Sequence, residues 1–258
     1  MAEMRPIPWG RLAFAGTLLT NWVFLVFPPL AVGLPYAHGL AAHWNLSFLA
    51  SPLSTYTMSA LLIIALLFFV RRRGEAWAGA GVIALMVLAY YIRSCQLPDD
   101  TGVGHSTFMP VAALIAYLIA QSLADHRQLP RPQAYGQEAA CGIVATGYGL
   151  AGFSKLQGAG LAWAQGSNLS YQIAVHSYTG APYLRPLRLW AAQRLGLCAV
   201  LGGLTLFIEC SFFLFAWAPA RKIYCALTIA MHAGIALLMG FNEFPFLFTA
   251  LSVGLLQL

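Results

Sequence analysis

Charged residues are scarce in this chain of 258 residues. Only 9% of the residues are charged and 60% are hydrophobic, whereas roughly a quarter of an average soluble domain is charged. So few charges cannot cover a water-facing surface, which excludes a single soluble globular domain. The apolar content also excludes disorder. The remaining fold class is an all-α bundle of membrane-spanning helices.

Sequence motifs for metal, nucleotide and hydrolase chemistry are missing as well. The chain has no CxxC, no HExxH, no Walker lysine and no G-x-S-x-G. A metal site is therefore weakly supported, and a P-loop nucleotide site and a serine hydrolase are unsupported. The five cysteines are odd in number, so no disulfide framework is expected. The net charge of +6 comes from small basic clusters between apolar runs, which is typical of topology signals and not of nucleic-acid binding.

Eight apolar runs predict about seven or eight membrane-spanning helices. Short connections separate most of these runs, so we expect one integral membrane domain over residues 1–258, without a separate lumenal domain. The runs cover about 11–34, 56–70, 76–92, 107–124, 139–153, 190–217, 223–241 and 244–258.

The basic residues predict how the helices are oriented. Most of them fall in one set of connections, which we expect to be cytoplasmic together with both termini. The membrane would be the plasma membrane, or the inner membrane in a bacterium. The stretch 154–189 then lies outside, where residues 168–176 have the spacing of a short interfacial helix. The basic residues of the cytoplasmic set are Arg5, Arg11, Arg71, Arg72, Arg73, Arg127, Arg131, Arg221 and Lys222.

Two ionisable residues lie inside apolar runs, Glu209 in the sixth and His232 in the seventh. Such residues are costly in lipid and mark structural or functional contacts. Both lie at a similar distance from the turn between the two runs, roughly 15–18 Å at 1.5 Å per residue. A Glu209–His232 contact is therefore available. The pair would either fix helix packing, relay a proton or contact a cofactor.

Lys155, one of only two lysines, follows the fifth run among apolar neighbours that include Trp163. Burial disfavours a charged amine and can leave a lysine as a base or nucleophile, and the alternative is a lysine that snorkels at a helix end. His105 precedes the fourth run. Because the fourth and fifth runs are consecutive and antiparallel, we expect both residues at the outer membrane face, where they could share a pocket.

The order of several motifs resembles the transmembrane domain of vitamin K-dependent γ-carboxylases, which is also called the horizontally transferred transmembrane domain. The upstream segment GHSTFMPVAALIAYLIAQSLADHRQLPRP is similar to a family segment in which His105 falls at the histidine. Gly104 stands where the family usually has Asn. The other matching motifs are Lys155-Leu156 after a span, Trp163 with Gly166, Glu209, and Met231-His232.

The resemblance implies quinol-dependent chemistry of the carboxylase or oxygenase type. Lys155 would act as the base on a reduced quinone of the vitamin K or menaquinone type, and His105 would assist. Oxygen would then convert the quinol toward an epoxide, and the strong base so formed would remove a proton from carbon. Trp163, Glu209 and His232 would contact the cofactor.

The implied partners are the lipid bilayer and a small or lipid-soluble substrate, or a partner protein that supplies the substrate site. No nucleic-acid partner is expected. The alternative function is a non-catalytic membrane subunit that binds a lipid, a quinone or a protein partner.

Overall fold

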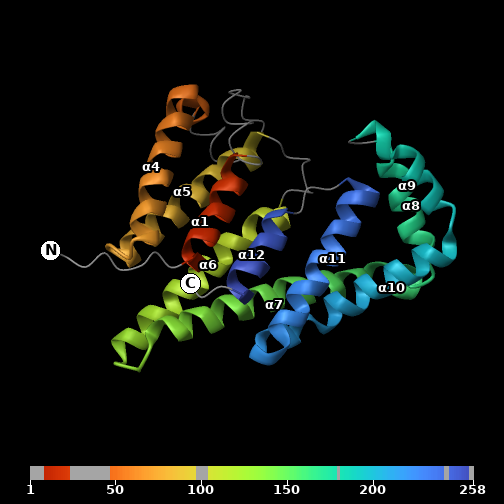
Figure 1. The fold of residues 1–258 in the computed structure, drawn as a ribbon. Helices are drawn as coiled ribbons and strands as arrows, with labels where there is room; N and C mark the ends of the chain where they lie inside the picture. The colour runs from red at the N-terminus through yellow and green to blue at the C-terminus, as the bar shows by residue number, and fades with distance from the viewer. Residues whose placement is uncertain (1–8, 24–46, 97–103, 179–180, 241–243, 256–258) are drawn as a thin grey trace. The chain divides into compact units, whose positions relative to one another are not determined.

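The computed structural model describes residues 9–23, 47–96, 104–178, 181–240 and 244–255 (Figure 1). Every regular element in these ranges is a helix, so the predicted all-α fold is confirmed. The chain divides into two compact units, Met1–Ala140 with Leu256–Leu258, and Cys141–Leu255. Helix α7 (Pro132–Ala159) contributes residues to both units.

The first unit is built on consecutive antiparallel helices. Helix α4 packs against α5 and α5 against α6, while α1 packs against α4 and α6. Ser51 caps α4 by accepting a hydrogen bond from the Ser54 backbone N–H, and Pro52 occupies the first turn, where its missing N–H costs nothing. The described elements are α1 (Trp9–Asn21), η2 (Ser47–Ala50), α4 (Pro52–Val70), α5 (Glu75–Gln96) and α6 (Gly104–His126).

The second unit contains the C-terminal part of α7. Helix α8 packs against α9 and α10, and α11 packs against α12. The elements after α7 are η4 (Gly160–Trp163), α8 (Ser167–His176), η5 (Pro182–Leu184), α9 (Arg185–Ala192), α10 (Leu195–Ser211), η6 (Phe212–Ala216), η7 (Ala218–Ala220), α11 (Arg221–Met239) and α12 (Phe244–Leu255).

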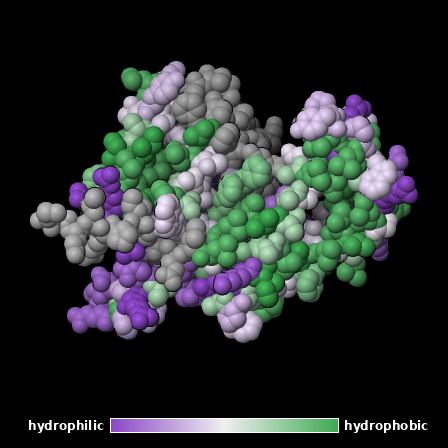
Figure 2. Space-filling model, viewed as in Figure 1, coloured by the Kyte–Doolittle hydropathy of each residue, from purple (hydrophilic) through white to green (hydrophobic). Residues whose placement is uncertain are grey.

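Five helical segments in the described part of the chain are long and apolar enough to cross a membrane. They match five of the predicted runs, and α12 is a shorter apolar helix. Large apolar side chains cover the outside of these helices, and hydrophobic residues predominate on the face seen in Figure 2. Such surfaces support an integral membrane protein. The five segments are Pro52–Val70, Glu75–Ile92, Phe108–His126, Leu195–Ala216 and Ala218–Met239.

Several runs differ from their predicted bounds. The run 139–153 belongs to the 28-residue α7, which is not among the five spanning segments. Polar residues at both ends of α7 continue the helix without adding hydropathy, so an apolar window could not find its ends. The run 190–217 includes the end of α9, and its helix α10 begins at Leu195. Residues 24–34 of the first run lie outside the described residues.

The short helix predicted over 168–176 is confirmed as α8, but its apolar face points elsewhere than expected. Leu169 and Ile173 are buried in a cluster with residues of α9, α10 and α11. The apolar face of α8 is therefore used inside the protein. Its outward side carries exposed residues such as Tyr171.

Candidate functional site

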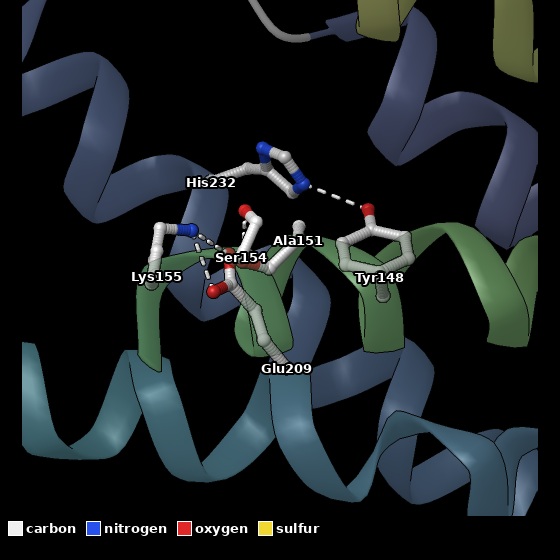
Figure 3. A network of polar contacts seen from close by, with 6 residues as sticks. All are labelled: Tyr148, Ala151, Ser154, Lys155, Glu209 and His232. Carbon is white, nitrogen blue, oxygen red and sulfur yellow. Dashed lines mark hydrogen bonds and ion pairs between the residues drawn. The ribbon is translucent and has the colours of Figure 1, made fainter. Parts of the chain in front are cut away.

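Lys155 and Glu209 form an ion pair between α7 and α10 (Figure 3). The Lys155 amine contacts both carboxylate oxygens, with 2.5 Å between Nζ and Oε2. The Glu209 side chain is only 6% exposed, whereas that of Lys155 is 25% exposed. A carboxylate buried among apolar helices is costly without a cation. Lys155 supplies this cation while the amine keeps an open side.

Gly152 brings the backbones of α7 and α10 into contact beside this ion pair. A Cβ atom at position 152 would lie 2.8 Å from the Cys210 backbone nitrogen and 2.9 Å from Cβ of Glu209. Lys155 follows three residues later, close to the same face of the helix. The missing side chain at Gly152 therefore sets the spacing that lets the amine reach the Glu209 carboxylate.

Trp163 lies over the amine from the turn that follows α7. The centre of its ring is 5.6 Å from Nζ of Lys155, a cation–π contact. Two glycines hold this turn against α10. A Cβ at Gly202 would lie 2.2 Å from the Trp163 carbonyl oxygen, and one at Gly166 would lie 2.4 Å from the Leu195 carbonyl oxygen. Gly166 also has a φ of 81°, which favours glycine.

Tyr148 and His232 form a second polar pair in the same unit. The Tyr148 hydroxyl and Nε2 of His232 share a hydrogen bond of 2.7 Å between α7 and α11. Both residues are buried. A phenol and an imidazole can each donate or accept, so this pair can hold or pass a proton. Figure 3 shows the side chains of both pairs pointing into the same region between α7, α10 and α11.

Aromatic packing fixes the ring of Tyr148. It stacks on Phe212 with 4.1 Å between ring centres and 16° between ring planes, and Phe246 meets it edge-on at 4.7 Å. Tyr224 meets Phe212 edge-on at 5.1 Å. Rings from α7, η6, α11 and α12 thus determine where the Tyr148 hydroxyl points.

The structure brings several of the predicted site residues together. Lys155, Trp163 and Glu209 meet directly, and His232 lies in the same region through its bond to Tyr148. Glu209 pairs with Lys155, a partner that the sequence interpretation did not give it, and the Glu209–His232 contact stays a prediction.

His105 is the second residue of α6 and belongs to the first unit. Its side chain lies outside the described residues. The shared pocket of His105 and Lys155 therefore stays a prediction.

Tyr148 is a site residue that the sequence interpretation missed. The sequence does contain a signal for it, because Tyr148 lies seven residues before Lys155, which is two helical turns along the same face. A phenol on that face is a polar group in apolar surroundings, and such groups have partners.

Proton-transfer groups make up this site: an amine, a carboxylate, an imidazole and a phenol. Within the described ranges, no three His, Cys, Asp or Glu side chains gather as metal ligands would. Groups of this kind can donate and accept protons in acid–base chemistry. Comparison with protein-family models, curated proteins and solved structures finds no match to this chain.

Proposed function

We propose that this protein is a membrane enzyme in which Lys155 takes a proton from the hydroxyl of a reduced quinone. The observation that carries the proposal is the Lys155–Glu209 pair, an amine with one open side inside an apolar helix bundle. The motif resemblance to the transmembrane domain of vitamin K-dependent γ-carboxylases suggests the reaction class, quinol-dependent carboxylation or oxygenation. The substrate is small or lipid-soluble, or is delivered by a partner protein.

A reduced quinone of the vitamin K or menaquinone type fits these residues by its chemistry. Its hydroxyl needs a proton acceptor, which is Lys155, and its ring needs aromatic or apolar contacts, which Trp163 offers. Phe153 and Leu161 flank Lys155 in the chain and are 60% and 67% exposed, so a membrane-soluble ring can approach from the lipid. When bound, the quinol supplies, together with oxygen, the strong base that an amine is not.

Glu209 has a defined role in this proposal. An amine accepts a proton only when it is neutral. Transfer of one proton along the Lys155–Glu209 hydrogen bond leaves a neutral amine and a neutral acid. Glu209 therefore stores the proton while Lys155 acts as the base. The Tyr148–His232 pair keeps a second proton near the site.

The test uses purified protein in lipid nanodiscs with reduced menaquinone or vitamin K under oxygen. Epoxide formation is measured by mass spectrometry for the wild type and Lys155→Ala. Lys222→Ala, which removes the other lysine at an exposed position, is the matched control. We expect a loss of at least ~100-fold for Lys155→Ala, the size typical of a general base, and no change for Lys222→Ala. Equal epoxide formation in the two variants contradicts the proposal.

The completeness of the ion pair favours a second candidate function. Lys155 and Glu209 already satisfy each other's charge, as in a pair that only joins α7 to α10. The protein would then be a non-catalytic membrane subunit that binds a lipid, a quinone or a protein partner. Lys155→Arg distinguishes the two functions, because arginine keeps the ion pair but stays charged. A catalytic lysine loses turnover in this variant, whereas a joining lysine keeps ligand binding and assembly.

A further inference from the structure

A buried arginine fastens helix α9 to the end of α11. The Arg188 Nε donates to the Leu237 carbonyl at 2.9 Å, and Nη2 donates to the Ala236 carbonyl at 3.4 Å. These carbonyls belong to the last turn of α11, where most helix carbonyls lack a donor four residues further along the helix. Gly240 ends α11 with a φ of 75°, and a Cβ there would lie 3.0 Å from the Arg188 guanidinium. Arg188 therefore fixes α9 at this end of α11.

Helix α8 supports α9 from its inner side. Leu169 and Ile173 of α8 share an apolar cluster with Ala192, Cys198 and Met239. The Ser170 hydroxyl also donates to the Ala192 carbonyl at 2.6 Å. Because α8 and α11 both hold α9, its backbone has a fixed position. The exposed side chains of α9 therefore extend from fixed positions.

Two exposed arginines, one at each end of α9, each lie beside an aromatic ring. The Arg185 guanidinium lies 4.0 Å from the ring centre of Tyr178, and that of Arg194 lies 5.6 Å from the ring centre of Trp190. All four residues are exposed. We call Tyr178, Arg185, Trp190 and Arg194 the arginine–aromatic surface.

In the part of the chain that the structure describes, no carboxylate is paired with Arg185 or Arg194. The sequence has no acidic residue between Glu138 and Glu209, and the ion pairs Arg11–Glu75 and Lys155–Glu209 include neither arginine. Two such exposed positive charges favour an anionic partner.

The surface also lies at the boundary of the membrane-spanning segments. Helix α9 ends directly before the segment Leu195–Ala216 and is bound to the end of the segment Ala218–Met239. Lipid phosphates lie at this depth, and so do the tryptophan and tyrosine rings that anchor membrane proteins.

We propose that the arginine–aromatic surface binds anionic phospholipid headgroups. Arg185 and Arg194 each donate charge-assisted hydrogen bonds to a lipid phosphate. Tyr178 and Trp190 contact the glycerol and upper acyl region, together with Leu187, which is 39% exposed on the same helix. A soluble anion would leave these apolar contacts unused. The proposal does not depend on the chemistry at Lys155.

Native mass spectrometry tests this site on the full protein purified in mild detergent. The protein is titrated with dioleoyl phosphatidylglycerol or dioleoyl phosphatidylcholine, and the bound lipids are counted. We expect the wild type to retain phosphatidylglycerol in preference to phosphatidylcholine. Affinity should fall roughly fivefold for each arginine replaced in Arg185→Gln and Arg194→Gln. Equal retention of the two lipids by the wild type overturns the proposal.

Two controls separate this site from unspecific attraction. Arg71→Gln with Arg73→Gln removes two exposed charges from the α4–α5 turn, and we expect it to keep the lipid preference. An equal loss in this control overturns the proposal. Displacement of phosphatidylglycerol by millimolar inorganic phosphate also overturns it, because the site would then take a free anion. Unchanged thermal unfolding of the Arg185 and Arg194 variants confirms that they are folded.

Discussion

Among the residues that the structure describes, each unit contains a cation–carboxylate pair, and the Arg11–Glu75 and Lys155–Glu209 pairs are built differently. In the first unit, Arg11 is fully buried and donates to Glu75 at 2.5 Å, to the Tyr117 hydroxyl at 2.7 Å and to the Phe69 carbonyl at 3.2 Å. In the second unit, Lys155 hydrogen-bonds to both oxygens of Glu209 and keeps a quarter of its side chain exposed.

The difference separates a structural charge from a usable one. An arginine stays charged in proteins, and its planar donors can each be matched to a fixed acceptor. A lysine can give up its proton and turn its single nitrogen toward another molecule. The first pair therefore joins helices α1, α4, α5 and α6, whereas the second leaves room for a reaction.

Loss of Arg11 should be the most damaging single change. Arg11→Met leaves Glu75 and the Tyr117 hydroxyl without their main partner in apolar surroundings. We expect a loss of about 3–5 kcal/mol in the free energy of unfolding, measured by denaturant titration in detergent micelles. Arg73→Met, at an exposed turn position, should stay within about 0.5 kcal/mol. A similar loss in both variants would mean that the Arg11 pair is not structural.

A methyl group at Gly152 should disturb the second pair through the backbone. Gly152→Ala forces α7 away from Cys210 and Glu209, and we expect a loss of about 1–3 kcal/mol. Gly149→Ala, one turn earlier on the same helix and with open space at its Cβ position, is the control and should be neutral or slightly stabilising. Thermal unfolding in detergent compares the two. If Gly149→Ala lowers the unfolding temperature more than Gly152→Ala does, the close approach of α7 and α10 is not what makes position 152 sensitive.

The Lys155–Glu209 pair should show coupling in a double-mutant cycle. Lys155→Met alone leaves a buried carboxylate, and Glu209→Gln alone leaves an amine without its counter-charge. We expect the double variant to be more stable than the sum of the two losses implies, by about 1.5 kcal/mol. Additive losses, determined by the same denaturant titration, would show that the two side chains do not depend on each other.

Removal of the Tyr148 hydroxyl should have the smallest effect on stability. Tyr148→Phe keeps the ring stacked on Phe212 and deletes only the hydrogen bond to His232. We expect a loss of about 1 kcal/mol. In the nanodisc assay, a proton-holding role also lowers epoxide formation in Tyr148→Phe, whereas a purely structural hydroxyl leaves turnover at the wild-type level. Thermal unfolding and turnover, measured on the same preparation, separate these two outcomes.

Much of the fold could be predicted because hydropathy is a local signal. Apolar runs located the five spanning segments, and the spacing of Leu169 and Ile173 located α8. The bounds of α7 could not be predicted in this way, since Gln133 and Gln157 continue its hydrogen-bonded backbone while lowering the hydropathy.

The site was harder to predict because depth in a hairpin does not determine which way a side chain faces. For this reason the sequence favours a contact of Glu209 with His232 on the following helix over one with Lys155, 54 residues earlier. Charge counting offers a better signal. Glu209 is the only acidic residue between positions 139 and 242, so a basic residue that pairs within this stretch must pair with Glu209. Lys155 lies among apolar neighbours, where a charged amine needs such a partner.

The contact of Arg188 with the last carbonyls of α11 has a consequence for bilayer thickness. Helix α11 has 19 residues and is therefore roughly 28 Å long, slightly less than the ~30 Å hydrocarbon core of an ordinary bilayer. A helix whose end carbonyls depend on water must reach the interface, but α11 receives donors from Arg188. Its end can lie just below the headgroups, so this part of the protein should tolerate hydrophobic mismatch in thicker membranes.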